Sequence, residues 1–169
     1  MKILIIEDDE FKQKRLAQAV RQLLPDAQLL TERSVNSGLK GIVDQRPDLI
    51  LLDMSLTTFD VGPSEPGGRP QNFGGIEVLR QMDRLEIVIP VIVITQHEKF
   101  ATSNQEEVHL SALQNELKED FEAVFNGLIY YNSAAGSWEK NLRTLINEVL
   151  KKLKKARDKS VSKNSRGRR

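Results

Sequence analysis

The stretch DLILLDMSL, residues 48–56, carries a run of four aliphatic residues directly into the carboxylate of Asp53. Similar runs occur elsewhere in the chain, as ILII at 3–6, VIVI at 91–94 and the weaker LIYY at 128–131. Runs without polar alternation are typical of strands that are buried on both faces, as in a parallel sheet. We therefore predict that Asp53 ends a buried central strand.

Segments of helical period lie between these runs. Apolar residues recur at intervals of three and four in FKQKRLAQAVRQLL, SVNSGLKGIVDQR, GIEVLRQM and WEKNLRTLINEVLKKL. With QLL at 28–30 as an edge strand, five strands alternate with five helices. This alternation predicts a doubly wound α/β fold with a five-stranded parallel sheet and helices on both faces. We expect the flavodoxin-like strand order 2-1-3-4-5.

Composition indicates one domain in a reducing compartment. The 169 residues are 39% hydrophobic and include no cysteine, which excludes disulfides and thiolate metal sites. The longest apolar run is far shorter than the ~20 residues of a membrane helix. We expect a cytoplasmic protein without membrane insertion.

Charge divides the chain into an acidic body and a basic end. Residues 151–169 hold ten basic residues and one acidic residue, whereas the preceding residues are acidic overall. We predict a domain over 1–153 and a disordered basic tail over 154–169. The tail either keeps the protein soluble or contacts a polyanion such as nucleic acid, and both roles remain open.

Acidic residues follow two of the predicted strands. Glu7, Asp8 and Asp9 come directly after the first run, and Asp53 ends the third strand. In the expected order these two strands are neighbours, and ligands bind beyond the carboxyl ends of such strands. A site of oxygen ligands without Cys or His favours a hard cation, most simply Mg²⁺. We expect Asp9 to start the following helix, outside the core of the site.

The motifs ILIIEDDE, PDLILLDMSL, GGIEVLRQM and PVIVIT resemble those of the receiver domains of two-component response regulators. These domains take a phosphoryl group from a histidine kinase onto an aspartate. The resemblance implies that Asp53 is the phosphoacceptor, that Asp8 binds Mg²⁺ directly and that Glu7 binds it through water. It also implies that Ser55 lends its backbone carbonyl to the metal and that Thr95 hydrogen-bonds the phosphoryl group.

The chain departs from the family after the fifth strand, where receivers carry a lysine followed by proline. Alignment without gaps places Tyr131 at the lysine position, and a slip of one residue places Asn132 there. Neither residue is a cation. Leu128 stands at the usual aromatic switch position, and Lys99 is a candidate substitute for the missing lysine.

Two segments are longer than in the family, at about 57–74 and 97–127. The first is rich in Gly and Pro and therefore predicts an irregular loop beside the site. In the second, SNQE resembles a helix-capping box, and apolar residues from Val108 to Val124 recur at helical spacing. We predict an extended, acidic fourth helix, with His97 and His109 as ordinary surface or loop residues.

These features favour a stand-alone receiver that binds Mg²⁺ and accepts a phosphoryl group on Asp53. Its partners would be a histidine kinase or phosphotransfer protein, and an output protein bound through the fourth helix and the insertions. The alternative is a receiver-like interaction module that works without phosphorylation. An aspartate-dependent phosphatase is disfavoured because Ser55 stands where that chemistry needs a second acid. We expect no enzymatic activity beyond self phosphoryl transfer.

Overall fold

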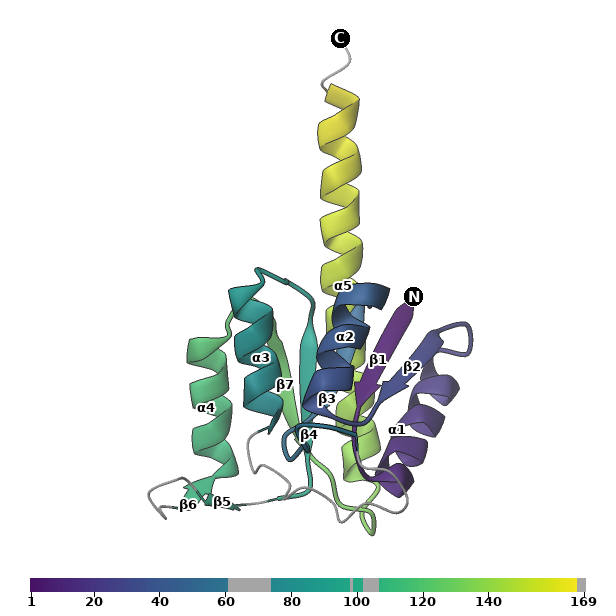
Figure 1. The fold of residues 1–169 in the computed structure, drawn as a ribbon. Coiled ribbons are helices and arrows are strands. Elements are labelled where there is room, and N and C mark those ends of the chain that lie inside the picture. Colours follow the sequence, from purple (N-terminus) through teal and green to yellow (C-terminus); the bar gives the residue numbers. More distant parts are fainter. Residues whose placement is uncertain (61–73, 98, 102–106, 167–169) are drawn as a thin grey trace.

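The computed structural model describes residues 1–60, 74–97, 99–101 and 107–166 (Figure 1). The strands of the main sheet are β1 (Lys2–Ile6), β2 (Gln28–Glu32), β3 (Leu49–Asp53), β4 (Val91–Thr95) and β7 (Phe125–Tyr130). The helices are α1 (Glu10–Leu23), α2 (Val35–Gln45), α3 (Gly74–Arg84), α4 (Leu110–Asp120) and α5 (Ser137–Arg166). Two short strands, β5 (Lys99–Ala101) and β6 (Glu107–His109), form a separate antiparallel pair.

The main sheet is parallel, with the order β2-β1-β3-β4-β7. This arrangement confirms the predicted doubly wound fold and the order 2-1-3-4-5. One hydrophobic cluster joins α1 and α5 to one face of the sheet, and a second joins α2, α3 and α4 to the other. The two helical layers are visible on either side of the strands in Figure 1.

The central strand β3 shows why its sequence lacks polar alternation. Ile50 and Leu52 pack towards α2, α3 and α4, while Leu49 and Leu51 pack towards α1 and α5. All four side chains are almost fully removed from solvent. Burying each aliphatic side chain contributes roughly 1.5–3 kcal/mol, so a polar residue on either face would weaken the core.

The fourth helix differs from the prediction of an extended helix. It begins at Leu110, because Val108 lies in the strand β6, and it ends at Asp120. Phe121 and Val124 follow the helix but are still buried in the core. Their spacing from Leu117 fits a helix, so the sequence predicted a helix longer than the one that forms. The proposed capping box at 103–106 lies outside the described residues, as does most of the predicted loop at 57–74.

The sequence predicted a disordered basic tail from residue 154, whereas the structure describes a helix over residues 154–166. Helix α5 continues through them to Arg166 and projects beyond the sheet in Figure 1. Lys, Arg and Ala are strong helix formers, so a segment with few apolar residues can still extend a helix that is already nucleated. Residues 167–169 lie outside the described part. Among the described residues, no helix is both long and apolar enough to cross a membrane.

Candidate functional site

Three carboxylates meet where the parallel strands β1 and β3 end. Glu7 and Asp8 directly follow β1, and Asp53 is the last residue of β3. One carboxylate oxygen from each residue lies within 4.8 Å of the other two. Glu7 and Asp53 are only 2% and 4% exposed, while Asp8 is half-buried. The pairing of β1 with β3 therefore brings together the three acids that the sequence singled out.

A buried lysine, Lys12, joins these acids. It lies in the first turn of α1 and is 2% exposed. Its Nζ lies 2.5 Å from Asp53 Oδ1 and 2.6 Å from Glu7 Oε2, and it donates a hydrogen bond of 3.2 Å to the carbonyl of Ile94. Each of the three ammonium protons therefore has an oxygen to face.

Sequence reasoning missed Lys12, although the sequence carries a signal for it. Lys12 precedes Leu16 and Val20 by four and eight residues, so it lies on the buried stripe of the amphipathic helix α1. Asp9 caps this helix, as expected, and its carboxylate accepts a hydrogen bond of 2.8 Å from the backbone N–H of Lys12. The cap fixes the first turn, which sends the lysine side chain towards the strand ends.

Burial and mutual repulsion perturb the charges of this cluster. Burial, and then the charge of Asp53, raise the pKa of Glu7 from 4.5 to about 8, although Lys12 opposes the shift. The same two causes raise the pKa of Asp8. Burial alone would lower the pKa of Lys12, but the charges of Asp53 and Glu7 outweigh it and raise that pKa. The ammonium therefore stays charged at neutral pH.

The donor set fits a divalent metal ion such as Mg²⁺. When all three acids are ionised, one ammonium leaves two negative charges uncompensated. Within the described part of the chain, Glu7 Oε2 contacts Lys12 Nζ at 2.6 Å and has no further polar partner. A hard dication would supply the missing charge through oxygen ligands. Glu7, Asp8 and Asp53 each offer one carboxylate oxygen to such an ion.

Ser55 and Thr95 flank the phosphoacceptor candidate. The backbone N–H of Ser55 donates a hydrogen bond of 2.8 Å to Asp53 Oδ2. Thr95 is the last residue of β4, fully buried, and its Oγ1 accepts a hydrogen bond of 3.1 Å from the backbone N–H of His97. Since β4 pairs with β3 in register, Thr95 stands one residue beyond the partner of Asp53.

Tyr131 lies beside the site and Asn132 points elsewhere. The Tyr131 ring is buried, its centroid is 5.7 Å from Lys12 Nζ, and it packs on Trp138 with 4.9 Å between the ring centroids. Burial raises the pKa of the Tyr131 hydroxyl. Asn132 is exposed, and its side-chain oxygen accepts a hydrogen bond from the backbone of Ala134. An aromatic ring thus stands at the lysine position of the gap-free alignment.

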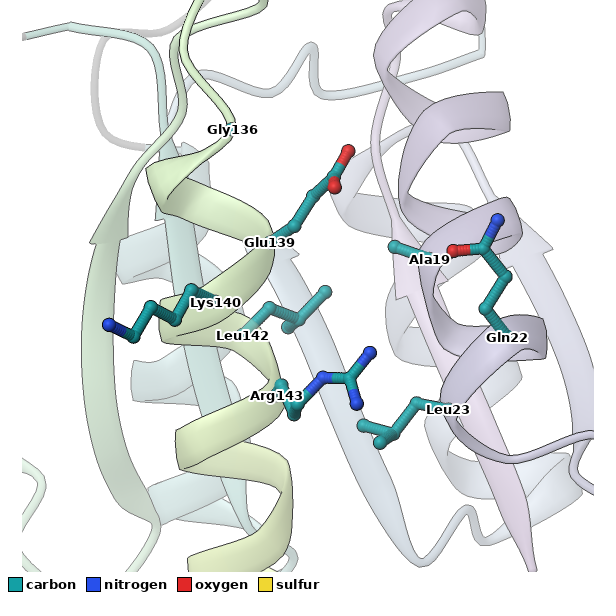
Figure 2. A pocket seen from close by; sticks show the side chains of 8 residues that line it. All are labelled: Ala19, Gln22, Leu23, Gly136, Glu139, Lys140, Leu142 and Arg143. Carbon is teal, nitrogen blue, oxygen red and sulfur yellow. The ribbon is translucent and has the colours of Figure 1, made fainter.

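A separate groove lies between α1 and α5 (Figure 2). Its volume is about 250 Å³, and its lining includes Glu139, Lys140 and Arg143 from α5 and Gln22 from α1. None of the acidic cluster lines this groove. The chemistry expected from the sequence therefore belongs to the strand ends and not to this groove.

Comparison with known sequences finds two relatives that match most of the chain. No protein-family model matches the chain. The uncharacterized protein y4jR of Sinorhizobium fredii (strain NBRC 101917 / NGR234) is 29% identical over 153 residues, which cover 87% of this chain and 99% of that protein. The Detocs response regulatory protein DtcB of Enterobacter cloacae (strain JD6301) is 25% identical over 151 residues, which cover 88% of this chain and 100% of that protein.

Two solved structures have a similar fold. A CheY-like response regulator receiver domain protein from Methanospirillum hungatei JF-1 matches with a TM-score of 0.61 at 18% identity, over 92% of this chain and 97% of the other. The N-terminal domain of a response regulator/sensory box/GGDEF 3-domain protein from Carboxydothermus hydrogenoformans matches with a TM-score of 0.59 at 19% identity, over 92% and 98%. The strand order agrees with this likeness. The chain thus has the fold of the response regulator receiver domains, in an atypical form that lacks the lysine after the last strand.

Proposed function

We propose that this protein is a cytoplasmic signalling receiver that binds Mg²⁺ and accepts a phosphoryl group on Asp53. The donor would be a histidine kinase or a phosphotransfer protein, and the output a contact with another protein. The observation that carries the proposal is the cluster of three acids at the ends of β1 and β3, two of which are buried and contact one ammonium. The likeness to a protein named as a response regulatory protein supports a signalling role.

The transfer would use Asp53 as the nucleophile. One carboxylate oxygen of Asp53 forms a bond to phosphorus while the bond between phosphorus and the donor atom breaks, and the electron pair leaves with the donor. An ionised carboxylate attacks without a general base, so positioning and charge supply most of the acceleration. Ser55 and Lys12 hold the two oxygens of Asp53, each through one hydrogen bond, and thereby orient the carboxylate.

Neighbouring residues would assist in distinct ways. Asp8, Asp53 and the backbone carbonyl of Ser55 would hold the metal directly, and Glu7 would hold it through water. Bound Mg²⁺ supplies positive charge to the phosphoryl oxygens. The Thr95 hydroxyl, which accepts a hydrogen bond from the backbone N–H of His97, would donate its own proton to one of these oxygens.

A second candidate function is a receiver-like module whose partner contacts do not depend on phosphate. The contact of Lys12 with both Asp53 and Glu7 favours it, because this ammonium already compensates part of the site's charge. Incubation with acetyl phosphate and Mg²⁺, followed by intact mass measurement, separates the two functions. The receiver should gain the mass of one phosphoryl group.

Two matched variants assign that mass to a residue. Asp53→Asn should abolish the gain, whereas Asp9→Asn should preserve it, because asparagine caps a helix as well as aspartate does. No gain in the wild-type protein would favour the phosphate-independent module. A gain that survives in Asp53→Asn would place the acceptor at another residue.

A further inference from the structure

We propose that Lys12 provides, from helix α1, the ammonium that contacts the phosphoryl group, in place of the lysine that receivers carry after their last strand. This inference rests on the proposed function. It assigns the charge that is missing after β7 to a residue of helix α1.

The burial of Lys12 calls for a reason in the chemistry of the site. Among the residues that the structure describes, Lys12 is the only buried lysine or arginine. A lysine is almost never fully buried unless it is paired, since removing the ammonium from water costs several kcal/mol. Here Asp53, Glu7 and the carbonyl of Ile94 compensate that cost. The chain therefore holds a charged group against the carboxylate on which a transferred phosphoryl group would bring additional negative charge.

The local structure directs this ammonium to Asp53. The Asp9 carboxylate holds the backbone N–H of Lys12 at 2.8 Å, and the side-chain amide of Gln13 donates a hydrogen bond of 3.0 Å to the carbonyl of Glu7. These two contacts fasten the first turn of α1 to the end of β1. Lys12 thus reaches Asp53 from a pinned backbone position.

Tyr131 lies next to the ammonium of Lys12. Its ring occupies the aligned lysine position and lies 5.7 Å from Lys12 Nζ. A ring face beside an ammonium is favourable, and the ring is itself packed on Trp138. The buried ammonium thus lies on helix α1, and an aromatic ring follows the end of β7.

Phosphorylation would redirect the charge of Lys12. When Asp53 becomes an acyl phosphate, its carboxylate charge is lost and the phosphoryl oxygens carry negative charge instead. The ammonium that now contacts Asp53 Oδ1 would follow the charge to a phosphoryl oxygen. Since Lys12 also binds the carbonyl of Ile94, which precedes Thr95, this movement acts on the end of β4.

Replacement of Lys12 by Met should change two affinities in opposite directions. The ammonium repels a metal ion among the same acids but attracts a phosphoryl group. Lys12→Met should therefore bind Mg²⁺ more tightly than the wild-type protein and bind beryllofluoride, a phosphoryl mimic, more weakly. A charge-assisted hydrogen bond of this kind corresponds to about a tenfold to hundredfold loss of affinity for beryllofluoride.

Isothermal titration of the full chain measures both affinities, first with Mg²⁺ alone and then with beryllofluoride at saturating Mg²⁺. Lys14→Met is the matched control, because Lys14 lies on the same helix but is exposed in an ion pair with Glu10.

The double variant Lys12→Met/Tyr131→Lys moves the ammonium to the position after the last strand and should recover beryllofluoride binding. Thermal unfolding in Mg²⁺ verifies folding, and Lys12→Gln replaces Lys12→Met if the latter does not fold.

The outcomes separate this inference from the proposed function. Equal beryllofluoride affinity in the wild-type protein and Lys12→Met overturns the role of Lys12 and leaves Asp53 as acceptor. Weaker Mg²⁺ binding by Lys12→Met overturns it too, because the lysine would then serve to arrange the acids. A wild-type protein that binds Mg²⁺ but no beryllofluoride overturns the proposed function and this inference with it.

Discussion

Replacement of Glu7 by Gln should flatten the pH dependence of stability in the metal-free protein. Burial and the charge of Asp53 raise the pKa of Glu7 from 4.5 to about 8 in the folded chain. In the unfolded chain the group returns to its ordinary pKa. Between these two values the folded protein holds a proton that the unfolded chain has released, so stability falls as pH rises. This contribution is fully present below pH 4.5 and lost above about pH 8.

The size of the effect follows from the width of this window. Each pH unit inside it removes up to about 1.4 kcal/mol from the free energy of unfolding. Between about pH 6 and about pH 8 the wild-type protein should therefore lose roughly 2 to 3 kcal/mol through Glu7. Gln has no proton to release, so Glu7→Gln should lose much less over the same interval. Lys12 adds no slope there, because its raised pKa keeps it charged.

Urea unfolding in EDTA at the two pH values measures the difference. Glu10→Gln is the matched control, since Glu10 is exposed and Lys14 lowers its pKa, so its titration falls below this window. Mg²⁺ should stabilise the wild-type protein more at the higher pH, where Glu7 is ionised. Equal loss of stability in wild type and Glu7→Gln would refute the reasoning, because Glu7 would then already be ionised in the fold.

Three further predictions follow from packing and charge. In EDTA at neutral pH, Lys12→Met should lower the free energy of unfolding by about 3 to 5 kcal/mol, since it leaves the buried carboxylate of Asp53 without its cation; Lys14→Met should leave it almost unchanged in the same urea titration. Gly75→Ala should destabilise the protein by roughly 1 to 3 kcal/mol, because a Cβ there would lie 2.5 Å from the carbonyl oxygen of Asp53. Gly136→Ala, which meets nothing within 4 Å, should melt like wild type, and a matching loss in both variants would contradict the packing argument. If the basic end of the chain contacts a polyanion, binding to heparin should weaken steeply with salt and disappear when residues 154–169 are deleted; binding that ignores salt or the deletion would argue against it.

Much of the fold was predictable because its central strands are buried on both faces. The uninterrupted aliphatic runs around Ile50 and Ile92 indicated buried parallel strands. The convergence of Glu7 and Asp53 then followed from the strand order. Asp9 was predictable for a local reason, since a carboxylate before a helix accepts from its free N–H groups.

The remaining features depend on tertiary contacts or on competing local signals. Lys12 was missed because lysine is normally a surface residue, and only its spacing from Leu16 indicates burial. The start of α4 was misplaced because Val108 fits a helical spacing and yet pairs with Phe100 in an antiparallel ladder. The helical end of α5 was missed because low hydrophobicity suggested disorder, whereas helix propensity is independent of burial.

The attachment of Lys12 to α1 has a consequence for sequence comparison. The first turn of α1 now holds both the cap at Asp9 and the charge of the site, so its inner positions cannot vary independently. Outer positions of the same turn, such as the exposed Phe11, are free of this constraint. A search for relatives that requires a lysine after the last strand will overlook such chains. A lysine four residues ahead of the first buried leucine of α1, paired with an aromatic residue at the strand end, would recover them.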